Sequence, residues 1–351
     1  MRAPTRRRLI VILLAAVGLV TASGAHAQRG ATDREHMASR PVEITARPIA
    51  HFDRSRPNVA RFGPLEFRGG LVLSSSDSDF GGWSGLIVGG NGSELFSVSD
   101  AGSWLSADIT YDGGRPTGLI KARMGTLAAL GGRELEQKRE QDAESLTLLD
   151  GTLGRGTLAI GFERLHRIGR FQITDREPRA PSGYFKLPPE ARRMQGNQGL
   201  EALAVIQAGP LRGSLVAFAE RFTRGSGYHS GWIWVRGEPR PIHLRDDDGF
   251  NITDAAGLPD GGLLVLERYF RWTSGVKMRL RRLSMSEIVP GAKLVGRTLV
   301  EADSGFEIDN MEGIAVHRGD GGETVVTLIS DDNFNRLLQR TILLQFVLHE
   351  D

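Results

Sequence analysis

The sequence predicts an all-β protein built from one repeated unit. Glycine accounts for 45 of the 351 residues, nearly twice its usual share of about 7%, which favours tight turns over long helices. Hardly any segment shows the apolar period of 3.6 residues that marks an amphipathic helix. The exception, residues 133–142, is charged on all sides and is expected to form a surface turn or a short helix. Five segments share one pattern, in which a short apolar strand, a Gly-rich turn and a second apolar strand ending in an acid follow one another.

These repeats predict a β-propeller. Each contains a polar residue near its start, and these leading residues recur every 53 to 60 positions, at Ser84, Glu144, Glu201, Asp254 and Glu312. A period near 57 fits a propeller blade of four short strands, slightly above the usual length of about 40–50 residues. Five motifs indicate five blades. A sixth is possible if the N-terminal strands belong to a blade whose motif has decayed.

The two ends of the repeat region are expected to close the propeller. Leu65–Ser74 is an apolar strand before the first repeat, and Arg340–Leu348 is another after the last. Terminal strands that complete one blade together remove exposed sheet edges. No linker interrupts the repeats, so residues 43–351 are interpreted as one domain, preceded by a polar, flexible lead-in over residues 28–42.

Residues 1–27 read as a secretory signal peptide. Four arginines precede an apolar run, Leu9–Val20, and Ala25-His26-Ala27 forms an A-x-A cleavage site. Cleavage after Ala27 would place the mature protein in the periplasm or outside the cell. Residues 5–10 also approximate a twin-arginine signal, so both the Sec and the Tat route are open. The apolar run is too short to span a bilayer comfortably, and no stable membrane span is expected after cleavage.

Charge and cysteine content exclude several classes of function. Cleavage removes four arginines and no acid, which leaves 40 basic against 42 acidic residues and a formal charge of −2. No nucleic-acid partner is therefore expected. The chain has no cysteine, which excludes a disulfide scaffold, a zinc ribbon, an iron–sulfur site and a thiol nucleophile. The oligomeric state is left open by the sequence.

The leading acids of the repeats predict a metal site. The first strand of each propeller blade lines the central channel, so Glu144, Glu201, Asp254 and Glu312 are expected to form a ring near one mouth, which Ser84 interrupts. Clustered carboxylates repel unless protons or a cation compensate. Calcium, a hard cation with oxygen ligands, is the first candidate. The neighbouring acid Asp309 is a further candidate ligand, and Asn251 and Asn310 could add oxygens. Alternatively, the acids cap backbone amides or pair with arginines.

The ends of the second strands supply the other candidate residues. An acid–arginine step recurs at Glu163-Arg164, Glu220-Arg221 and Glu267-Arg268, and structural ion pairs are the favoured interpretation, with anion binding by the arginines as the alternative. The candidate substrate-binding residues are Arg221, Arg268 and His229, the last in a glycine-rich stretch that resembles a contact loop. The candidate catalytic bases are Asp100, Asp331 and Asp332.

Familiar motifs of other hydrolases and metal proteins do not occur. The chain contains no H-E-x-x-H, P-loop or G-x-S-x-G motif. Residues 244–255 resemble an EF-hand loop, but Leu244 and Ala255 occupy the first and last ligand positions, so that interpretation fails. The aromatic residues Trp232, Trp234, Phe270 and Trp272 are expected to fill the space between sheets.

Several motifs together resemble a known family. They are FGGWSGL (80–86), SVSDAG (97–102), DAESL (142–146), NQGLEALA (197–204), ITDAAGLPDGGLLVLER (252–268), DNMEGIAV (309–316), LISDDNF (328–334) and QRTILLQF (339–346). With them the chain is similar to the bacterial phytase-like proteins with esterase-like activity. The resemblance implies a propeller that hydrolyses ester or phosphoester bonds, and related propeller phytases use clustered Ca²⁺ ions to bind substrate phosphates.

The resulting hypothesis is an exported hydrolase of a small-molecule phosphomonoester or carboxylic ester, with a divalent cation held by the carboxylate ring. Two alternatives stay open. One is a non-catalytic propeller that binds a ligand, a glycan or an envelope protein, because fold alone does not determine function. The other is a sugar-lactone hydrolase or an oxidoreductase of similar architecture.

Overall fold

The computed structural model describes residues 39–89, 91–194, 199–223, 227–273 and 275–349, which all lie in one unit, Met37–Asp351. The expected signal peptide, and the lead-in up to residue 38, lie outside the described residues. Within these ranges, helical structure is limited to two 3₁₀ turns, η1 (Leu130–Gly132) and η2 (Pro189–Arg193), and one short helix, α2 (Lys138–Gln141). The short helix lies within the charged segment for which a turn or helix is predicted. None of the described helices is long and apolar enough to cross a bilayer.

The strands form five sheets, in each of which successive strands are hydrogen-bonded to one another. The first contains β1 (Arg40–Pro41), β8 (Arg115–Thr126), β7 (Ser103–Asp112), β6 (Glu94–Ser99) and β5 (Trp83–Val88). The second contains β12 (Glu177–Tyr184), β11 (Arg167–Thr174), β10 (Arg155–Phe162) and β9 (Ala143–Gly151). The third contains β13 (Leu200–Val205), β14 (Leu215–Thr223), β15 (Tyr228–Val235), β16 (Glu238–Arg245) and β20 (Lys293–Leu294).

The remaining two sheets complete the unit. The fourth contains β17 (Asn251–Gly257), β18 (Leu263–Arg271), β19 (Gly275–Leu283) and β21 (Arg297–Ala302). The fifth contains β2 (Thr45–Ile49), β4 (Leu65–Ser74), β24 (Thr341–Leu348), β23 (Thr324–Asp331) and β22 (Asn310–Arg318), and β3 (Arg61–Phe62) pairs with β4. Neighbouring strands of the described chain are antiparallel except for β16 and β20.

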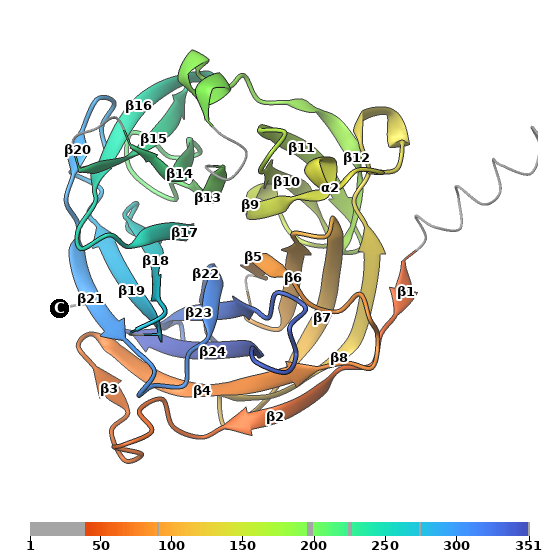
Figure 1. The fold of residues 1–351 in the computed structure, drawn as a ribbon, viewed down its shortest axis with the longest axis vertical. Coiled ribbons are helices and arrows are strands. Elements are labelled where there is room, and N and C mark those ends of the chain that lie inside the picture. Colours follow the sequence, from red (N-terminus) through yellow and green to blue (C-terminus); the bar gives the residue numbers. More distant parts are fainter. Residues whose placement is uncertain (1–38, 90, 195–198, 224–226, 274, 350–351) are drawn as a thin grey trace, which may run out of the picture. The chain divides into compact units, whose positions relative to one another are not determined.

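The five sheets surround a common centre (Figure 1). The first strand of each repeat, β5, β9, β13, β17 or β22, lies innermost, and each of these strands contacts the next one around the ring. The prediction of an all-β propeller with one blade for each of the five motifs is confirmed. This arrangement brings residues from distant parts of the chain together at the two mouths of the central channel.

The fifth sheet combines strands from both ends of the described chain. The strand β4 has the bounds expected from the sequence, and it pairs with β24, with Leu65 opposite Leu348 and Leu73 opposite Thr341. Regular structure also begins earlier than residue 43, because β1 pairs with β8 inside the segment interpreted as a flexible lead-in. Residues 40 and 41 therefore belong to the first sheet.

Aromatic residues differ in burial from what the sequence predicts. Trp232 and Trp234 are buried between the second and third sheets, as expected. Phe270 and Trp272 are instead 48% and 94% exposed. The reason is that β18 and β19 continue beyond the sheet edge as a hairpin, in which Phe270 pairs with Val276. The prediction that these two residues fill space between sheets is wrong.

Candidate functional site

Each inner strand carries a β-bulge near its first residue. The register of pairing with the second strand of the sheet skips one residue in every case. The skipped residues are Ser84, Glu144, Glu201, Thr253 and Glu312. A bulge re-aims the side chain of the extra residue and is common beside functional sites. Three of the four acids expected at these positions are therefore equivalent in the structure.

Asp254 is the exception, because the bulge in β17 falls on Thr253. The Asp254 carboxylate is fully buried and accepts hydrogen bonds from the backbone N–H groups of Ala255, at 2.8 Å, and Ile314, at 2.9 Å. It therefore connects β17 to β22. Gly85 of β5 corresponds to Asp254, because each directly follows the bulge of its strand. A Cβ added to Gly85 would lie 2.7 Å from Cβ of Leu146, so the residue after the bulge packs closely against the neighbouring inner strand. The structure does not bring Asp254 into the group of acids expected from the sequence.

A second set of equivalent positions lies on the second strands, next to the bulges. In each sheet, the inner-strand residue just before the bulge pairs with a residue of the second strand. The member of this set is the next residue along that second strand. The set consists of Asp100, Glu163, Glu220, Arg268 and Asp331. In the fourth sheet an arginine thus replaces the acid. Glu267, one residue earlier, is fully buried and forms ion pairs with Arg279 and Arg281.

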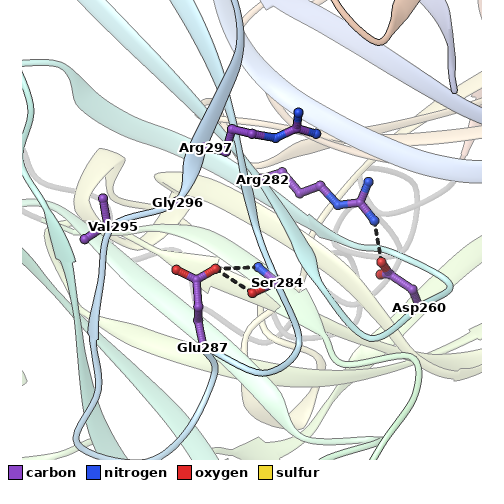
Figure 2. Close-up of a pocket in the computed structure, with 7 residues that line it drawn as sticks. All are labelled: Asp260, Arg282, Ser284, Glu287, Val295, Gly296 and Arg297. Carbon is purple, nitrogen blue, oxygen red and sulfur yellow. Dashed lines mark hydrogen bonds and ion pairs between the residues drawn. The ribbon is translucent and has the colours of Figure 1, made fainter. Parts of the chain in front are cut away.

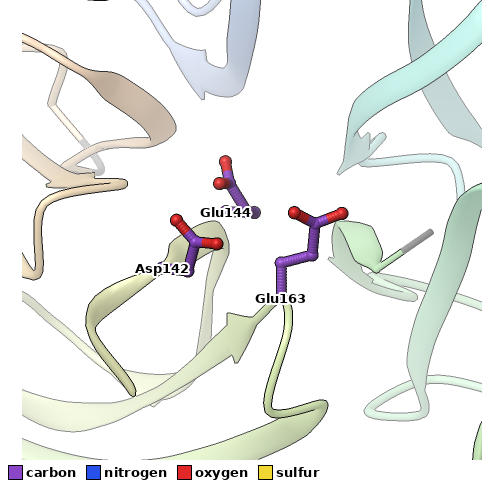
Figure 3. Close-up of side chains that lie close together, drawn as sticks. All are labelled: Asp142, Glu144 and Glu163. Atoms are coloured by element: carbon purple, nitrogen blue, oxygen red, sulfur yellow. The ribbon is translucent and has the colours of Figure 1, made fainter. Parts of the chain in front are cut away.

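The carboxylates converge in two overlapping groups. One contains Asp142, Glu144 and Glu163, and the other contains Glu163, Glu201 and Glu220; within each group, one oxygen of every residue lies within 4.8 Å of the others. Figure 3 shows the first group extending from β9 and the end of β10 into one space. Glu163 belongs to both groups. Sequence reasoning assigned Glu163 and Glu220 to structural ion pairs and overlooked Asp142, although the acid that ends each second strand was a usable signal.

Burial and mutual repulsion shift the pKa values of these acids upward. Burial raises the pKa of Glu144 well above its usual value, and the charges of Asp142 and Asp100 raise it further. The pKa of Glu201 is likewise raised well above its usual value by burial and then by the charges of Glu144 and Glu220. A cluster in this state takes up protons or a cation.

Glu312 and Asp331 form the part of the cluster that faces Arg268. Burial raises the pKa of Glu312 to about 7, although the charge of Arg268 lowers it. The pKa of Asp331 is raised well above its usual value by burial, and next by the charge of Glu312. Nε of Arg268 lies 3.2 Å from Oε1 of Glu312, and its Nη2 lies 4.0 Å from Oε1 of Glu220.

Two other basic side chains neutralise the cluster in part. Nζ of Lys138 lies 2.7 Å from Oδ2 of Asp100 and 3.1 Å from Oδ1 of Asp142. Nε of Arg164 lies 2.5 Å from Oδ2 of Asp142. Arg164 and Arg268, two of the three arginines of the acid–arginine steps, therefore form ion pairs, but with acids other than the one that precedes each of them. Arg221 lies in β14, and its side chain is outside the described part of the structure.

The remaining candidate acids have structural partners. Oδ1 of Asp332 accepts hydrogen bonds from the N–H groups of Gly82, at 3.2 Å, and Phe334, at 3.1 Å. Asp309 accepts hydrogen bonds from the backbone N–H groups of Asn310, at 3.0 Å, and Arg340, at 3.1 Å. Neither belongs to the two acidic groups found among the described residues.

His229 does not lie in a contact loop, contrary to its glycine-rich surroundings in the sequence. It is part of β15 and 2% exposed, and its Nε2 lies 3.8 Å from Oδ1 of Asp246. Burial lowers its pKa, so the imidazole is neutral at pH 7.

The donor set fits a hard divalent cation. The converging groups offer carboxylate oxygens only, and Oδ1 of Asp100 is buried without a hydrogen-bond partner in the described part of the chain. Calcium takes six to eight oxygen ligands at about 2.3–2.6 Å and accepts flexible geometry. Asp142, Glu144, Glu163, Glu201 and Glu220 are the residues that would hold it.

Three cavities among the described residues bear on the location of the site. One of about 380 Å³ lies beside the acidic cluster and is lined by Gly249, Asn251, Arg268, Tyr269, Phe270 and Arg271. One of about 970 Å³ is lined by the distal halves of the inner strands and hence lies at the opposite mouth of the channel. A third, of about 610 Å³, contains an ion pair of Arg282 with Asp260 and hydrogen bonds of Ser284 to Glu287 (Figure 2). Of these three, the first adjoins the carboxylates.

Comparisons with solved structures find matches at low similarity. A gluconolactonase from Xanthomonas campestris is 12% identical, with a TM-score of 0.39, over 88% of this chain and 95% of that chain. The WD40 repeats of RRP9 are 10% identical, with a TM-score of 0.38, over 88% and 100% of the two chains. An α-L-arabinofuranosidase from Podospora anserina, in complex with cellotriose, is 10% identical, with a TM-score of 0.38, over 77% and 93%. At these scores the similarity carries no information on function.

Comparison with curated proteins finds no match. A family model described as phytase-like, esterase-like activity of phytase, matches residues 78–334. This range extends from the turn before β5 to the loop after β23 and contains every residue of the two acidic groups. The chain therefore belongs to the phytase-like family with esterase-like activity.

Proposed function

We propose that the protein is an exported hydrolase that cleaves a phosphomonoester or a carboxylic ester with the help of a divalent cation, calcium first among the candidates. The observation that carries this proposal is the burial of two overlapping carboxylate groups, which share Glu163, at one mouth of the channel. Such a cluster is costly to keep charged in the absence of a cation. The family description, with its esterase-like activity, supports the same reaction class.

When bound, the cation supplies positive charge that stabilises the charge developing on the ester and favours deprotonation of an attacking water. Asp142, Glu144, Glu163, Glu201 and Glu220 hold it in this proposal. Arg268, beside Glu220 and Glu312, binds the anionic group of the substrate, because it provides a fixed guanidinium at the edge of the cluster.

Asp331, with Glu312 next to it, is assigned the role of proton acceptor. Its raised pKa makes it a stronger base than an ordinary aspartate. The water oxygen bonds to the phosphorus or the carbonyl carbon, and the bond from that atom to the alcohol oxygen breaks. One water proton passes to Asp331 and then to the departing alcohol.

Hydrolysis of p-nitrophenyl phosphate and p-nitrophenyl acetate by the mature chain tests this function. Turnover that a chelator abolishes and Ca²⁺ restores is expected for one of the two, and it would identify the ester class. Turnover that is insensitive to chelation would refute the role of the cation. No turnover of either ester by protein shown to be folded would refute the hydrolase and favour a ligand-binding propeller.

Export is part of the proposal and has its own test. Cleavage after Ala27 predicts a mature chain that begins at Gln28 and accumulates outside the cytoplasm. Mass spectrometry of the protein from a fractionated bacterial host measures both. An intact N-terminus in a cytoplasmic fraction would contradict export.

A further inference from the structure

The cavity of about 380 Å³ beside the acidic cluster differs in character from the cluster itself. It is enclosed by the start of β17 and the end of β18, and Arg268 belongs to both the cavity and the cluster. Its polar lining residues are Arg268, Arg271, Tyr269 and Asn251, and none of the described carboxylates lines it. An anion that approaches the acidic mouth therefore finds its attractive surface at this cavity.

This cavity exists because of the register of the fourth sheet. The bulge at Thr253 places Arg268 where the other sheets have Asp100, Glu163, Glu220 and Asp331. The same sheet continues past this position as the hairpin of β18 and β19, with Arg268 opposite Met278 and Arg271 opposite Gly275. The hairpin thus forms a wall next to the position at which the ester is expected to react.

The wall presents aromatic side chains to the solvent. Tyr269 and Phe270 line the cavity, and Trp272 packs edge-on against Phe270 with ring centroids 5.6 Å apart. The guanidinium of Arg271 lies 5.2 Å from the ring centroid of Tyr269. Exposed aromatic rings beside cationic groups favour a flat, unsaturated ligand that carries a negative charge.

We propose that this cavity binds the organic part of the substrate and selects small anionic esters that carry an aryl group. The inference rests on the proposed hydrolase, since it names the substrate class of the same site. Successive residues of a strand point to opposite faces, so Arg268 and Phe270 share one face of β18. The anionic group lies against Arg268, and the aryl group contacts Phe270. The subsite is therefore made by one hairpin and the loop that faces it.

Binding of phenylphosphonate, which cannot be hydrolysed as an ester, tests this subsite by calorimetry on the Ca²⁺-loaded mature protein. Methylphosphonate carries the charge without the ring, and benzyl alcohol carries the ring without the charge. Phenylphosphonate is expected to bind about fivefold more tightly than either, because each of the other two ligands lacks one of the two contacts. Equal affinities for the two phosphonates would overturn the proposal.

Variants separate the two contributions. Arg268→Gln is expected to weaken both phosphonates about threefold to fivefold, the size of a partly exposed charge contact. Phe270→Ala is expected to weaken phenylphosphonate alone, by about fivefold to tenfold, and Phe270→Leu provides a second variant if the first unfolds. The matched controls are Arg240→Gln, at an exposed position of β16, and Leu337→Ala, in a different loop and 96% exposed. Equal effects of Phe270→Ala and Leu337→Ala in folded protein would refute the aryl contact.

Failure of this subsite can be told apart from failure of the hydrolase. Tight phenylphosphonate binding without turnover of either nitrophenyl ester would refute the hydrolase and leave the subsite standing. Turnover with no preference for phenylphosphonate over methylphosphonate would refute the subsite alone.

Discussion

Nε of Arg268 lies 3.2 Å from Oε1 of Glu312, and the two side chains come from neighbouring sheets. This contact links an acid at the channel mouth to Arg268, the one basic residue among the five equivalent positions of the second strands. It also keeps the pKa of Glu312 near 7, since burial raises it and the charge of Arg268 lowers it. The pair thus couples the protonation of the cluster to the group proposed to bind the substrate.

Removing Arg268 is expected to raise the pKa of Glu312 above about 7. In Arg268→Gln, the pH at which hydrolysis reaches half its maximum is expected to shift upward by about one unit, because an opposite charge at this range moves a pKa by at least that amount. The pH dependence of kcat/KM measures the shift. Arg268→Lys keeps the charge and is expected to restore most of the profile. Superimposable profiles of wild type and Arg268→Gln would show that Glu312 does not control the reaction.

Glu163 is expected to matter most for cation binding, because it belongs to both acidic groups. Glu163→Gln removes one charge from a mutually repelling set. Without Ca²⁺ the variant should melt about 2 °C or more above the wild type, and its gain in Tm on adding Ca²⁺ should be smaller. Thermal unfolding with chelator and with Ca²⁺ provides both numbers.

Glu238→Gln serves as the control for this experiment, since Glu238 is an exposed acid that pairs with Lys186 far from the cluster. It should leave the Ca²⁺-dependent gain unchanged. A Glu163→Gln protein that gains as much from Ca²⁺ as the wild type would contradict the assigned ligand set.

Stability without a cation should fall as pH rises. The folded-state pKa of Glu312 is raised to about 7 from an ordinary value of 4.5, so the folded protein binds more protons than the unfolded chain between those values. Its stability therefore decreases as pH increases through this window. Glu144 and Glu201 act in the same direction. Denaturant unfolding of chelated protein at pH 5 and pH 7 measures the effect, and saturating Ca²⁺ should reduce it. Constant stability over this range would argue against protonated carboxyls in the cluster.

Asp254 should behave as a structural residue. Asp254→Ala leaves the buried N–H groups of Ala255 and Ile314 without their acceptor, which is expected to cost about 2–3 kcal/mol of unfolding free energy. Asp254→Asn retains one acceptor oxygen and should cost less. Calcium titration of whichever variant stays folded is expected to match the wild type. A large loss of affinity in Asp254→Asn would instead restore the ring ligand that the sequence predicts.

The sequence predicts the repeats well because strand length, turns and apolar alternation are local properties. The bounds of β4 follow from these signals, and each of the five inner strands contains one of the predicted leading residues. Sequence spacing places Asp254 in the group of acids, because spacing along the chain does not reveal that the bulge of β17 falls on Thr253. A slip of one residue moves a side chain to the other face of a strand, and in β17 and β18 it exchanges Asp254 for Thr253 and Glu267 for Arg268.

The leading residues of the repeats do not by themselves predict the whole acidic cluster, which also contains Asp142, Glu163 and Glu220. Glu163 and Glu220 look, from sequence, like partners of the arginines that follow them. Arg164 in fact contacts Asp142, and Arg268 contacts Glu312 and Glu220, so these pairs cross between strands and sheets. Such pairings depend on tertiary structure, which local sequence does not specify.

The pairing of β4 with β24 has a consequence for biogenesis. The strand β4 is synthesised early. Its neighbour β24, which lies between β4 and β23, consists of residues 341–348 and is synthesised last of the three. Until those residues emerge, β4 and β23 both carry an unpaired edge that can associate with other chains. Completing this sheet requires contacts of very high sequence separation, which makes it a slow step in folding. A chaperone that shields the edge of β4 would therefore have to act until nearly the entire chain has been synthesised.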